Sequence, residues 1–239
     1  MTLGAVVGHA FGNVYVITTR PDADVVRGVN LMKGRPANQV GSLTTTRELV
    51  PALLDWSRLP DGLSREVVTA IVNRLFQMGP FGFRGPAGAH IPDHLVAYDG
   101  DIRTTQVIAP GYTCPSNALL AQAMVLRGVQ FLYITSANRS RHLSGADDEP
   151  AHFTAEGVLH EFGHEPNFLV LQHADETAAR AMYPLHSPMS TTILGFHKLG
   201  APDEHGRPRL IVERHGSLLA SRLALRVYKD VRRGLRSMA

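Results

Sequence analysis

Residues 129–138 read VQFLYITSAN, a near-continuous apolar run that ends in small polar residues. Such a run is typical of a strand that is buried on both faces of a sheet. Ser136 and Asn138 follow it at the carboxyl end of the strand, where open α/β sheets bind their ligands. Their hydroxyl and amide groups offer donors and acceptors, although a turn that ends the strand needs the same residue types. Both residues are therefore candidates for ligand contacts.

The rest of the chain alternates between segments with the hydrophobic periodicity of a strand and segments with that of a helix. Before the apolar run, Ser116 is expected to cap a helix that Gly128 ends. Residues 79–88 contain four Gly and two Pro and are expected to form a loop. Further strands are expected at 14–19, 43–46, 106–109, 168–171, 191–194 and 210–213, and helices near 22–29, 47–56, 64–75 and 155–162. This alternation indicates an α/β domain with one sheet, but its uneven spacing does not fit a TIM barrel. No strand is followed by a glycine-rich dinucleotide or P-loop motif.

The composition excludes several classes of protein. The chain has 239 residues, 44% of them hydrophobic and 19% charged, which excludes a disordered or collagen-like chain. Its one cysteine, Cys114, cannot form an internal disulfide, so a cytoplasmic protein is expected. No apolar run reaches about 18 residues, and no Lys or Arg precedes the first apolar run. We therefore expect neither a membrane span nor a signal peptide.

The net charge of +3 is unevenly distributed. From Arg214 onward the chain has seven basic residues and one acidic residue, whereas the preceding residues sum to −3. Residues 217–239 have the pattern of a helix with one apolar stripe and a basic remainder. We expect this helix to pack on the main domain, residues 1–216, with binding of RNA or an anionic membrane surface as the alternative.

A metal-binding pattern occurs at residues 160–164, where HEFGH matches H-E-x-x-H. On a helix this spacing places two imidazoles one turn apart, so that they could bind zinc while Glu161 acts as a base. Glu176 or His173 could supply a third ligand. Pro166 would end the helix almost at once. A solvated helix end without metal is therefore favoured, and a zinc hydrolase based on His160, Glu161 and His164 is a less favoured alternative.

Three further segments carry groups suited to anions. Lys33 and Arg35 flank a glycine in the sequence KGRP, so a phosphate or carboxylate could approach the backbone and meet the planar guanidinium. Ser190 precedes an expected strand, and Arg214 ends another. Taken singly, basic residues of this kind are usually solvated surface groups.

The order of these segments resembles that of the YrdC/TsaC family over most of the chain. In that family a strand with a Tyr is followed by K-G-R-P, a P-G-P loop, S-A-N, a helix, an S-T strand and R-x-G. The matching segments here are Tyr15, residues 33–36, 78–80, 136–138, 154–159, Ser190-Thr191 and residues 214–216. The series explains the H-E-x-x-H match as the end of the family's ordinary helix, where no metal is bound.

The resemblance implies a twisted mixed α/β sheet with flanking helices and a concave, positively charged cavity. It implies synthesis of threonylcarbamoyl-AMP from L-threonine, bicarbonate and ATP, a nucleotidyltransferase reaction that uses Mg²⁺ on the phosphates and releases pyrophosphate. The product would serve tRNA modification, with tRNA or double-stranded RNA and tRNA-modification proteins as partners. Lys33 and Arg35 would hold phosphates or a carboxylate, Ser136 and Asn138 would contact the nucleotide, and Ser190 and Arg214 would complete the phosphate site. Catalysis would then depend on positioning and on charge neutralisation.

Several family positions differ in this chain. Gly82 replaces a Thr after the P-G-P loop, and Ile108 replaces the Arg of R-x-P. Arg139 and Ser140 follow S-A-N in place of a Ser-Gly pair. These departures support an alternative in which the fold is kept as a nucleotide- or RNA-binding module that has lost catalysis.

Overall fold

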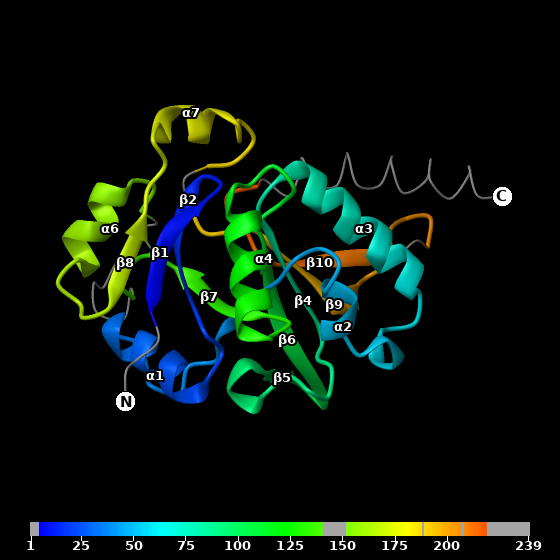
Figure 1. Ribbon diagram of the computed structural model, residues 1–239. Helices are drawn as coiled ribbons and strands as arrows, with labels where there is room; N and C mark the ends of the chain where they lie inside the picture. The colour runs from blue at the N-terminus through cyan, green and yellow to red at the C-terminus, as the bar shows by residue number, and fades with distance from the viewer. Residues whose placement is uncertain (1–4, 141–151, 188, 207, 219–239) are drawn as a thin grey trace.

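The apolar run at residues 129–138 forms the strand β7 near the middle of a mixed sheet. The computed structural model describes residues 5–140, 152–187, 189–206 and 208–218. Within these residues ten strands form one sheet in the order β10-β9-β4-β6-β3-β7-β2-β1-β8, and β5 pairs with β6 (Figure 1). The strands are β1 Val6–Phe11, β2 Val14–Thr19, β3 Ser42–Thr44, β4 Phe81–Pro86, β5 Ala97–Asp99, β6 Ile102–Ala109, β7 Leu132–Ser136, β8 Phe168–Leu171, β9 Ile193–Gly200 and β10 Arg209–Arg214. The predicted twisted mixed α/β sheet is confirmed.

Within the described residues the α-helices are fewer than the strands. They are α1 Ala23–Met32, α2 Val50–Leu53, α3 Arg65–Met78, α4 Ser116–Arg127, α6 Ala155–Phe162 and α7 Glu176–Ala181, with 3₁₀ turns at Trp56–Arg58 and Asp93–Leu95. Ser64 caps α3 as expected, since its side chain accepts a hydrogen bond from the backbone of Val67 at 3.3 Å. Gly128 ends α4 in the left-handed conformation with φ 63°. Within the described residues, no helix is long and apolar enough to cross a membrane.

β7 pairs antiparallel with both of its neighbours. Ser136 lies opposite Val16 of β2, and Ile134 lies opposite Ser42 of β3. The side chains of Leu132, Tyr133 and Ile134 are all buried. The expectation of a strand covered on both faces is therefore confirmed, with a start at Leu132 in place of Val129.

The expectation of a loop over residues 79–88 is wrong, because residues 81–86 form β4. Phe81 and Phe83 are buried in the main core, and the strand pairs with both β6 and β9. Its glycines permit close packing, since a Cβ atom at Gly82 would lie 2.9 Å from side-chain atoms of Ile108 and Ile193. The glycines here allow close packing, and Pro86 lies at the end of the strand. Composition alone cannot distinguish such a strand from a loop, because both are rich in Gly and Pro.

Other expected boundaries also move. The helix expected over 47–56 is reduced to the four residues of α2, whose first turn contains Pro51. Ser116 is the first residue of α4, and its hydroxyl donates to the carbonyl of Ala10 in place of capping its own helix. The predicted basic helix over 217–239 lies, from residue 219 on, outside the described residues.

Two apolar clusters cover the two faces of the sheet. On one face Leu120 and Met124 of α4 pack against residues from five strands: Phe11, Val14, Val16, Ile108, Leu132, Ile134 and Ile193. On the other face α1, α3 and α6 contribute to the larger core, with Val29, Leu75 and Phe162 among its buried residues. Burial of apolar surface at about 25 cal/mol per Å² makes these two clusters the main stabilising features of the fold.

Candidate functional site

The end of α1 and the end of β7 are tied together, although they lie far apart in sequence. The side chain of Lys33 is fully buried, and its ammonium group donates to the carbonyl of Ser136, 103 positions along the chain. The backbone N–H of Ser140 in turn donates to the carbonyl of Lys33 at 2.9 Å. Gly34 follows in the left-handed conformation with φ 70°, which lets the chain leave α1 toward Arg35. The K-G-R-P and S-A-N segments thus form one polar cluster.

Arg35 and Asn138 complete this cluster. Arg35 Nη1 donates to Thr135 Oγ1 at 2.8 Å. Asn138 is 1% exposed, and its Nδ2 donates to the carbonyl of Arg139 at 2.9 Å. Its buried Oδ1 atom accepts no hydrogen bond from the described residues. A ligand group that carries a donor could satisfy this oxygen.

Glu161 holds the loop that carries Asn138. Its Oε1 accepts a hydrogen bond from the backbone N–H of Arg139 at 2.8 Å, and its Oε2 contacts His152 Nε2. The H-E-x-x-H glutamate is therefore engaged with a loop and does not face two histidines. His160 and His164 are both exposed, and His164 lies beside Glu165 at 3.5 Å. Among the described residues, these side chains do not form a group that could hold zinc.

Tyr15 of β2 supports the cluster from the other side. Its carbonyl accepts a hydrogen bond from the backbone of Ala137 at 2.9 Å, and its hydroxyl donates to Glu176 Oε1 at 2.5 Å. Burial raises the pKa of Tyr15 well above its usual value, with Glu176 adding to the shift, so the phenol stays protonated. Sequence patterns did not identify Glu161, near the end of α6, or Glu176, at the start of α7, as supports, since a single Glu at either place has no distinctive signal.

Ser190 and Arg214 form a second cluster at the start of β9 and the end of β10. Arg214 donates to the carbonyl of Thr191 at 3.0 Å and to its hydroxyl at 3.2 Å. The backbone of Ser217 donates to the carbonyl of Ser190 at 2.8 Å. A Cβ atom at Gly216 would lie 2.3 Å from that carbonyl oxygen, so this close approach requires glycine. The S-T and R-x-G segments are thus in contact.

The tip of the β1–β2 hairpin connects the two clusters. The side chain of Asn13 donates to the carbonyl of Ser187, shortly before Ser190, whereas Tyr15 contacts the S-A-N loop. Gly12 packs against Pro80 of the P-G-P segment, where a Cβ atom would lie 2.3 Å from Pro80 Cγ. We call this set of contacts among Asn13, Tyr15, Ala137 and Ser187 the hairpin junction. It brings together segments that lie far apart in the described chain.

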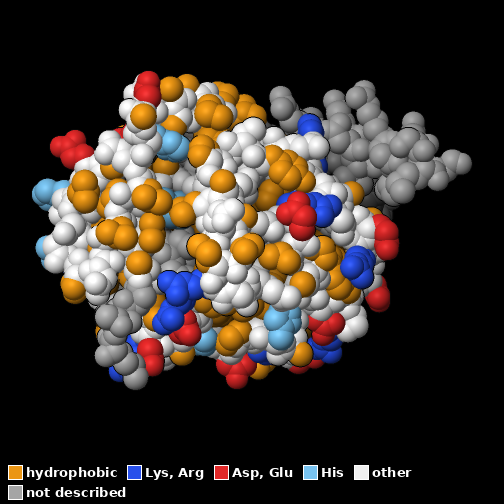
Figure 2. Space-filling view, in the orientation of Figure 1, with side chains coloured by type: hydrophobic (Ala, Val, Ile, Leu, Met, Phe, Trp, Pro, Cys, Tyr) orange, Lys and Arg blue, Asp and Glu red, His pale blue; other side chains and the backbone are white. Residues whose placement is uncertain are grey.

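The face of the sheet beneath α4 is apolar. Gly82 and Ile108, which replace polar residues of the family pattern, contact one another on this face, and Ile108 packs with Leu120 and Met124. In the view of Figure 2, Lys and Arg side chains are scattered singly and do not gather into one patch. Two cavities of 140 and 320 Å³ adjoin Arg20 and Arg127 beside α4, away from Lys33 and Asn138.

Comparisons with known proteins identify the fold. No protein-family model matches the sequence, and no curated protein matches it closely. Sua5 of P. abyssi in complex with L-threonine superposes with a TM-score of 0.58 at 17% identity, covering 82% of this chain and 48% of Sua5. This chain therefore spans about half the length of that protein.

Two shorter proteins match over most of their own length. The hypothetical protein smu.1377c from Streptococcus mutans has a TM-score of 0.63 at 14% identity, covering 95% of this chain and 86% of that protein. E. coli YciO has a TM-score of 0.56 at 13% identity, covering 89% and 84%. Both are YrdC/Sua5-domain proteins. The resemblance inferred from the ordered motifs is confirmed at the level of the fold: the described chain has the fold of the YrdC/Sua5 domain.

Proposed function

We propose that this protein makes threonylcarbamoyl-AMP from ATP, L-threonine and bicarbonate, for use in tRNA modification. The observation that carries the proposal is the cluster of Lys33, Arg35, Ser136 and Asn138. The two halves of this cluster lie 100 and 103 positions apart, yet the fold joins them through direct contacts. The likeness to Sua5, which was crystallised with L-threonine, supports the same substrate class.

Each residue has a distinct proposed role. Arg35 offers planar donors suited to a phosphate or carboxylate, and Asn138 offers a buried amide oxygen to a donor on the nucleotide or amino acid. Lys33 fixes the carbonyl of Ser136 and places a positive charge behind the loop. Ser190 and Arg214 would complete the phosphate site from the β9–β10 side, reached across the hairpin junction.

The chemistry would consist of positioning and charge neutralisation. Threonine and bicarbonate would form a carbamate with loss of water, the carbamate oxygen would attack the α-phosphorus of ATP, and pyrophosphate would leave. Glu161 and Glu176, the carboxylates beside the cluster, each accept a backbone hydrogen bond, from Arg139 and Ala155. Mg²⁺ would therefore be held mainly by the phosphates of ATP, which is how this ion commonly binds beside nucleotides. Bound there, it would neutralise charge on the phosphates.

Pyrophosphate release tests the proposal. The purified full chain should release pyrophosphate only when ATP, L-threonine and bicarbonate are all present. Arg35→Ala should lower the rate at least about tenfold, since loss of a charge-assisted hydrogen bond costs about 1.5–3 kcal/mol. Arg27→Ala is the matched control, because Arg27 lies exposed on helix α1, shortly before Arg35 in the chain.

Two results would contradict the proposal. One is an absence of threonine-dependent pyrophosphate release by the folded wild-type protein. The other is an equal effect of Arg27→Ala and Arg35→Ala. Binding of ATP without release of pyrophosphate would instead support the catalytically inactive binding module, for which the apolar pair Gly82 and Ile108 is the relevant feature.

A further inference from the structure

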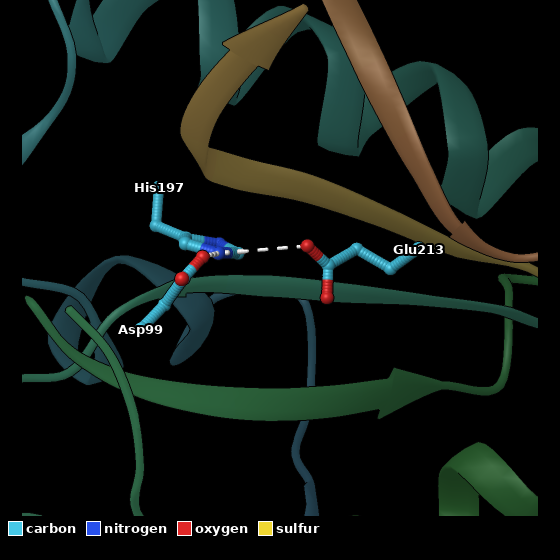
Figure 3. Close-up of side chains that lie close together, drawn as sticks. All are labelled: Asp99, His197 and Glu213. Atoms are coloured by element: carbon cyan, nitrogen blue, oxygen red, sulfur yellow. Dashed lines mark hydrogen bonds and ion pairs between the residues drawn. The ribbon is translucent and has the colours of Figure 1, made fainter.

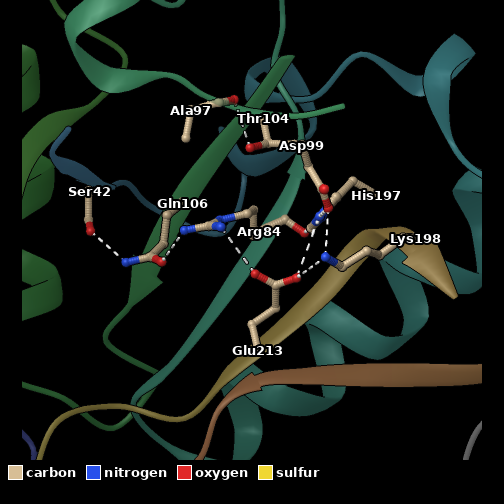
Figure 4. Close-up of polar contacts among 9 residues, drawn as sticks. All are labelled: Ser42, Arg84, Ala97, Asp99, Thr104, Gln106, His197, Lys198 and Glu213. Carbon is tan, nitrogen blue, oxygen red and sulfur yellow. Dashed lines mark hydrogen bonds and ion pairs between the residues drawn. The ribbon is translucent and has the colours of Figure 1, made fainter. Parts of the chain in front are cut away.

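A row of polar side chains crosses the sheet away from the proposed substrate site. Gln106 donates to Ser42 Oγ at 2.7 Å and accepts from Arg84 Nη2 at 3.3 Å. Arg84 pairs with Glu213 Oε2 at 3.1 Å (Figure 4). We call Ser42, Arg84, Asp99, Gln106, His197, Lys198 and Glu213 the polar network. It continues from Glu213 to a compact group at its far end.

This group contains one imidazole and two carboxylates. His197 Nε2 lies 2.9 Å from Asp99 Oδ2 and 3.5 Å from Glu213 Oε1 (Figure 3). One donor atom from each of the three side chains lies within 4.8 Å of the other two. The residues come from three strands, β5, β9 and β10, so the sheet itself fixes their spacing. Around a tetrahedral ion with ligands at about 2.0–2.1 Å, neighbouring donor atoms are roughly 3.4 Å apart.

Two donor atoms point to a common ligand. The His197 side chain is fully buried, and its Nδ1 lies 3.4 Å from the carbonyl of Arg84, an arrangement that leaves Nε2 facing the carboxylates. Glu213 has a side chain 12% exposed, and its buried Oε1 has only long contacts, with Lys198 Nζ at 3.4 Å and His197 Nε2 at 3.5 Å, and no well-formed hydrogen bond. Buried carboxylate oxygens normally accept hydrogen bonds or contact a cation. A cation held between Nε2 and Oε1 would be a close partner for Oε1 and would replace the 2.9 Å hydrogen bond between Nε2 and Asp99 Oδ2.

Lys198 now supplies the positive charge at this position. Its Nζ lies 2.6 Å from Asp99 Oδ2 and 3.4 Å from Glu213 Oε1. With Arg84 it balances the two carboxylates, so the group carries no net charge when His197 is neutral. The Lys198 side chain is 43% exposed, however, and a flexible exposed stem can move its ammonium group into solvent. Lys198 and a bound metal ion would therefore compete for the same oxygens.

We propose that Asp99, His197 and Glu213 form a binding site for a divalent transition-metal ion, and that Lys198 closes this site when no metal is bound. One imidazole and two carboxylates suit Zn²⁺ or Mn²⁺, whereas Mg²⁺ prefers oxygen ligands alone. Asp99 is the most exposed ligand, so water can complete the coordination from its side. The site links β5, β9 and β10 and does not depend on the proposed synthase activity.

Isothermal titration of the purified full chain with Zn²⁺, Mn²⁺ and Mg²⁺ tests the proposal. The wild-type protein should bind one equivalent of Zn²⁺ or Mn²⁺ at this site and no Mg²⁺. Lys198→Ala should bind the metal several-fold more tightly, because the competing ammonium group is gone. Asp99→Asn should bind at least about tenfold more weakly and should lose the rise in melting temperature that metal gives the wild-type protein.

The control separates this site from the other histidines. A double variant, His160→Ala with His164→Ala, removes two exposed imidazoles and should keep the same affinity. Asp99 is chosen for substitution because it is partly exposed, whereas the buried His197→Ala variant could fail to fold for other reasons. The proposal is overturned if Lys198→Ala and Asp99→Asn both bind like the wild type, or if the double variant abolishes binding.

Discussion

The hairpin junction and the polar network are both polar regions on one sheet, but they are held together by different atoms. The junction depends on backbone groups, as in the bonds from Ala137 to the Tyr15 carbonyl and from Asn13 to the Ser187 carbonyl. The polar network depends on bonds between side chains, from Ser42 to Asp99. Where two backbone segments approach closely, a Cβ atom would clash and glycine is required, whereas loss of one side-chain bond in a partly exposed network removes only that contact. The difference predicts which substitutions are severe.

The largest effect is expected at Gly216, in the cluster that the junction connects. Gly216→Ala would place a Cβ atom 2.3 Å from the backbone oxygen of Ser190, so one of the two segments must move. We expect a loss of about 3 kcal/mol in the free energy of unfolding, measured by urea denaturation. Gly200→Ala on β9 is the control, since its Cβ would meet only ordinary contacts near 3.7 Å. Equal losses of unfolding free energy in the two variants would show that the close backbone contact at Gly216 is not the cause of its sensitivity.

A second effect depends on pH and involves His9 on β1. Its ring bonds to Ser116 Oγ at 3.0 Å and to Thr18 Oγ1 at 2.7 Å, and burial lowers its pKa to about 4. Below pH 6.5 this histidine binds a proton in the unfolded chain but not in the folded chain. The free energy of unfolding therefore falls as the pH is lowered from 6.5 to about 4. The expected loss is on the order of 3 kcal/mol over this range. Urea denaturation at several pH values measures it, and His9→Gln should flatten the dependence. An equal slope in both proteins would contradict the assignment.

The smallest effect is expected at Glu161, which positions the loop carrying Asn138. Glu161→Gln keeps an acceptor for the Arg139 N–H but weakens it, so pyrophosphate release should fall about tenfold with stability little changed. A rise in KM for threonine or ATP should accompany the loss, because the substitution displaces a binding loop. Glu156→Gln, on the exposed face of the same helix α6, is the control and should leave the rate unchanged. Gln106→Ala in the polar network should also leave the rate of pyrophosphate release unchanged. A tenfold loss of rate in this variant would show that the polar network contributes to the activity.

Much of the fold follows from local sequence patterns. The apolar run that becomes β7, the β-branched run of β2 and the capped helices α3 and α6 lie where periodicity predicts them. β4 was missed because its glycines and prolines are those of a loop, and only its neighbours β6 and β9 reveal that the glycines allow close packing. β1 and β5 were also missed, since their short patterns gain stability mainly from the strands beside them.

The candidate site divides in the same way. The sequence by itself was enough to select K-G-R-P, S-A-N and R-x-G as candidate site segments. Glycine and short polar side chains mark places where backbone segments approach closely. The sequence also determined the order of the motifs, and with it the YrdC-like fold. Only the tertiary structure decided that Glu161 holds a loop in place of a metal, and that Asp99, His197 and Glu213 meet. Each of these residues is unremarkable in the sequence, and its role comes from contacts between segments that lie far apart in the chain.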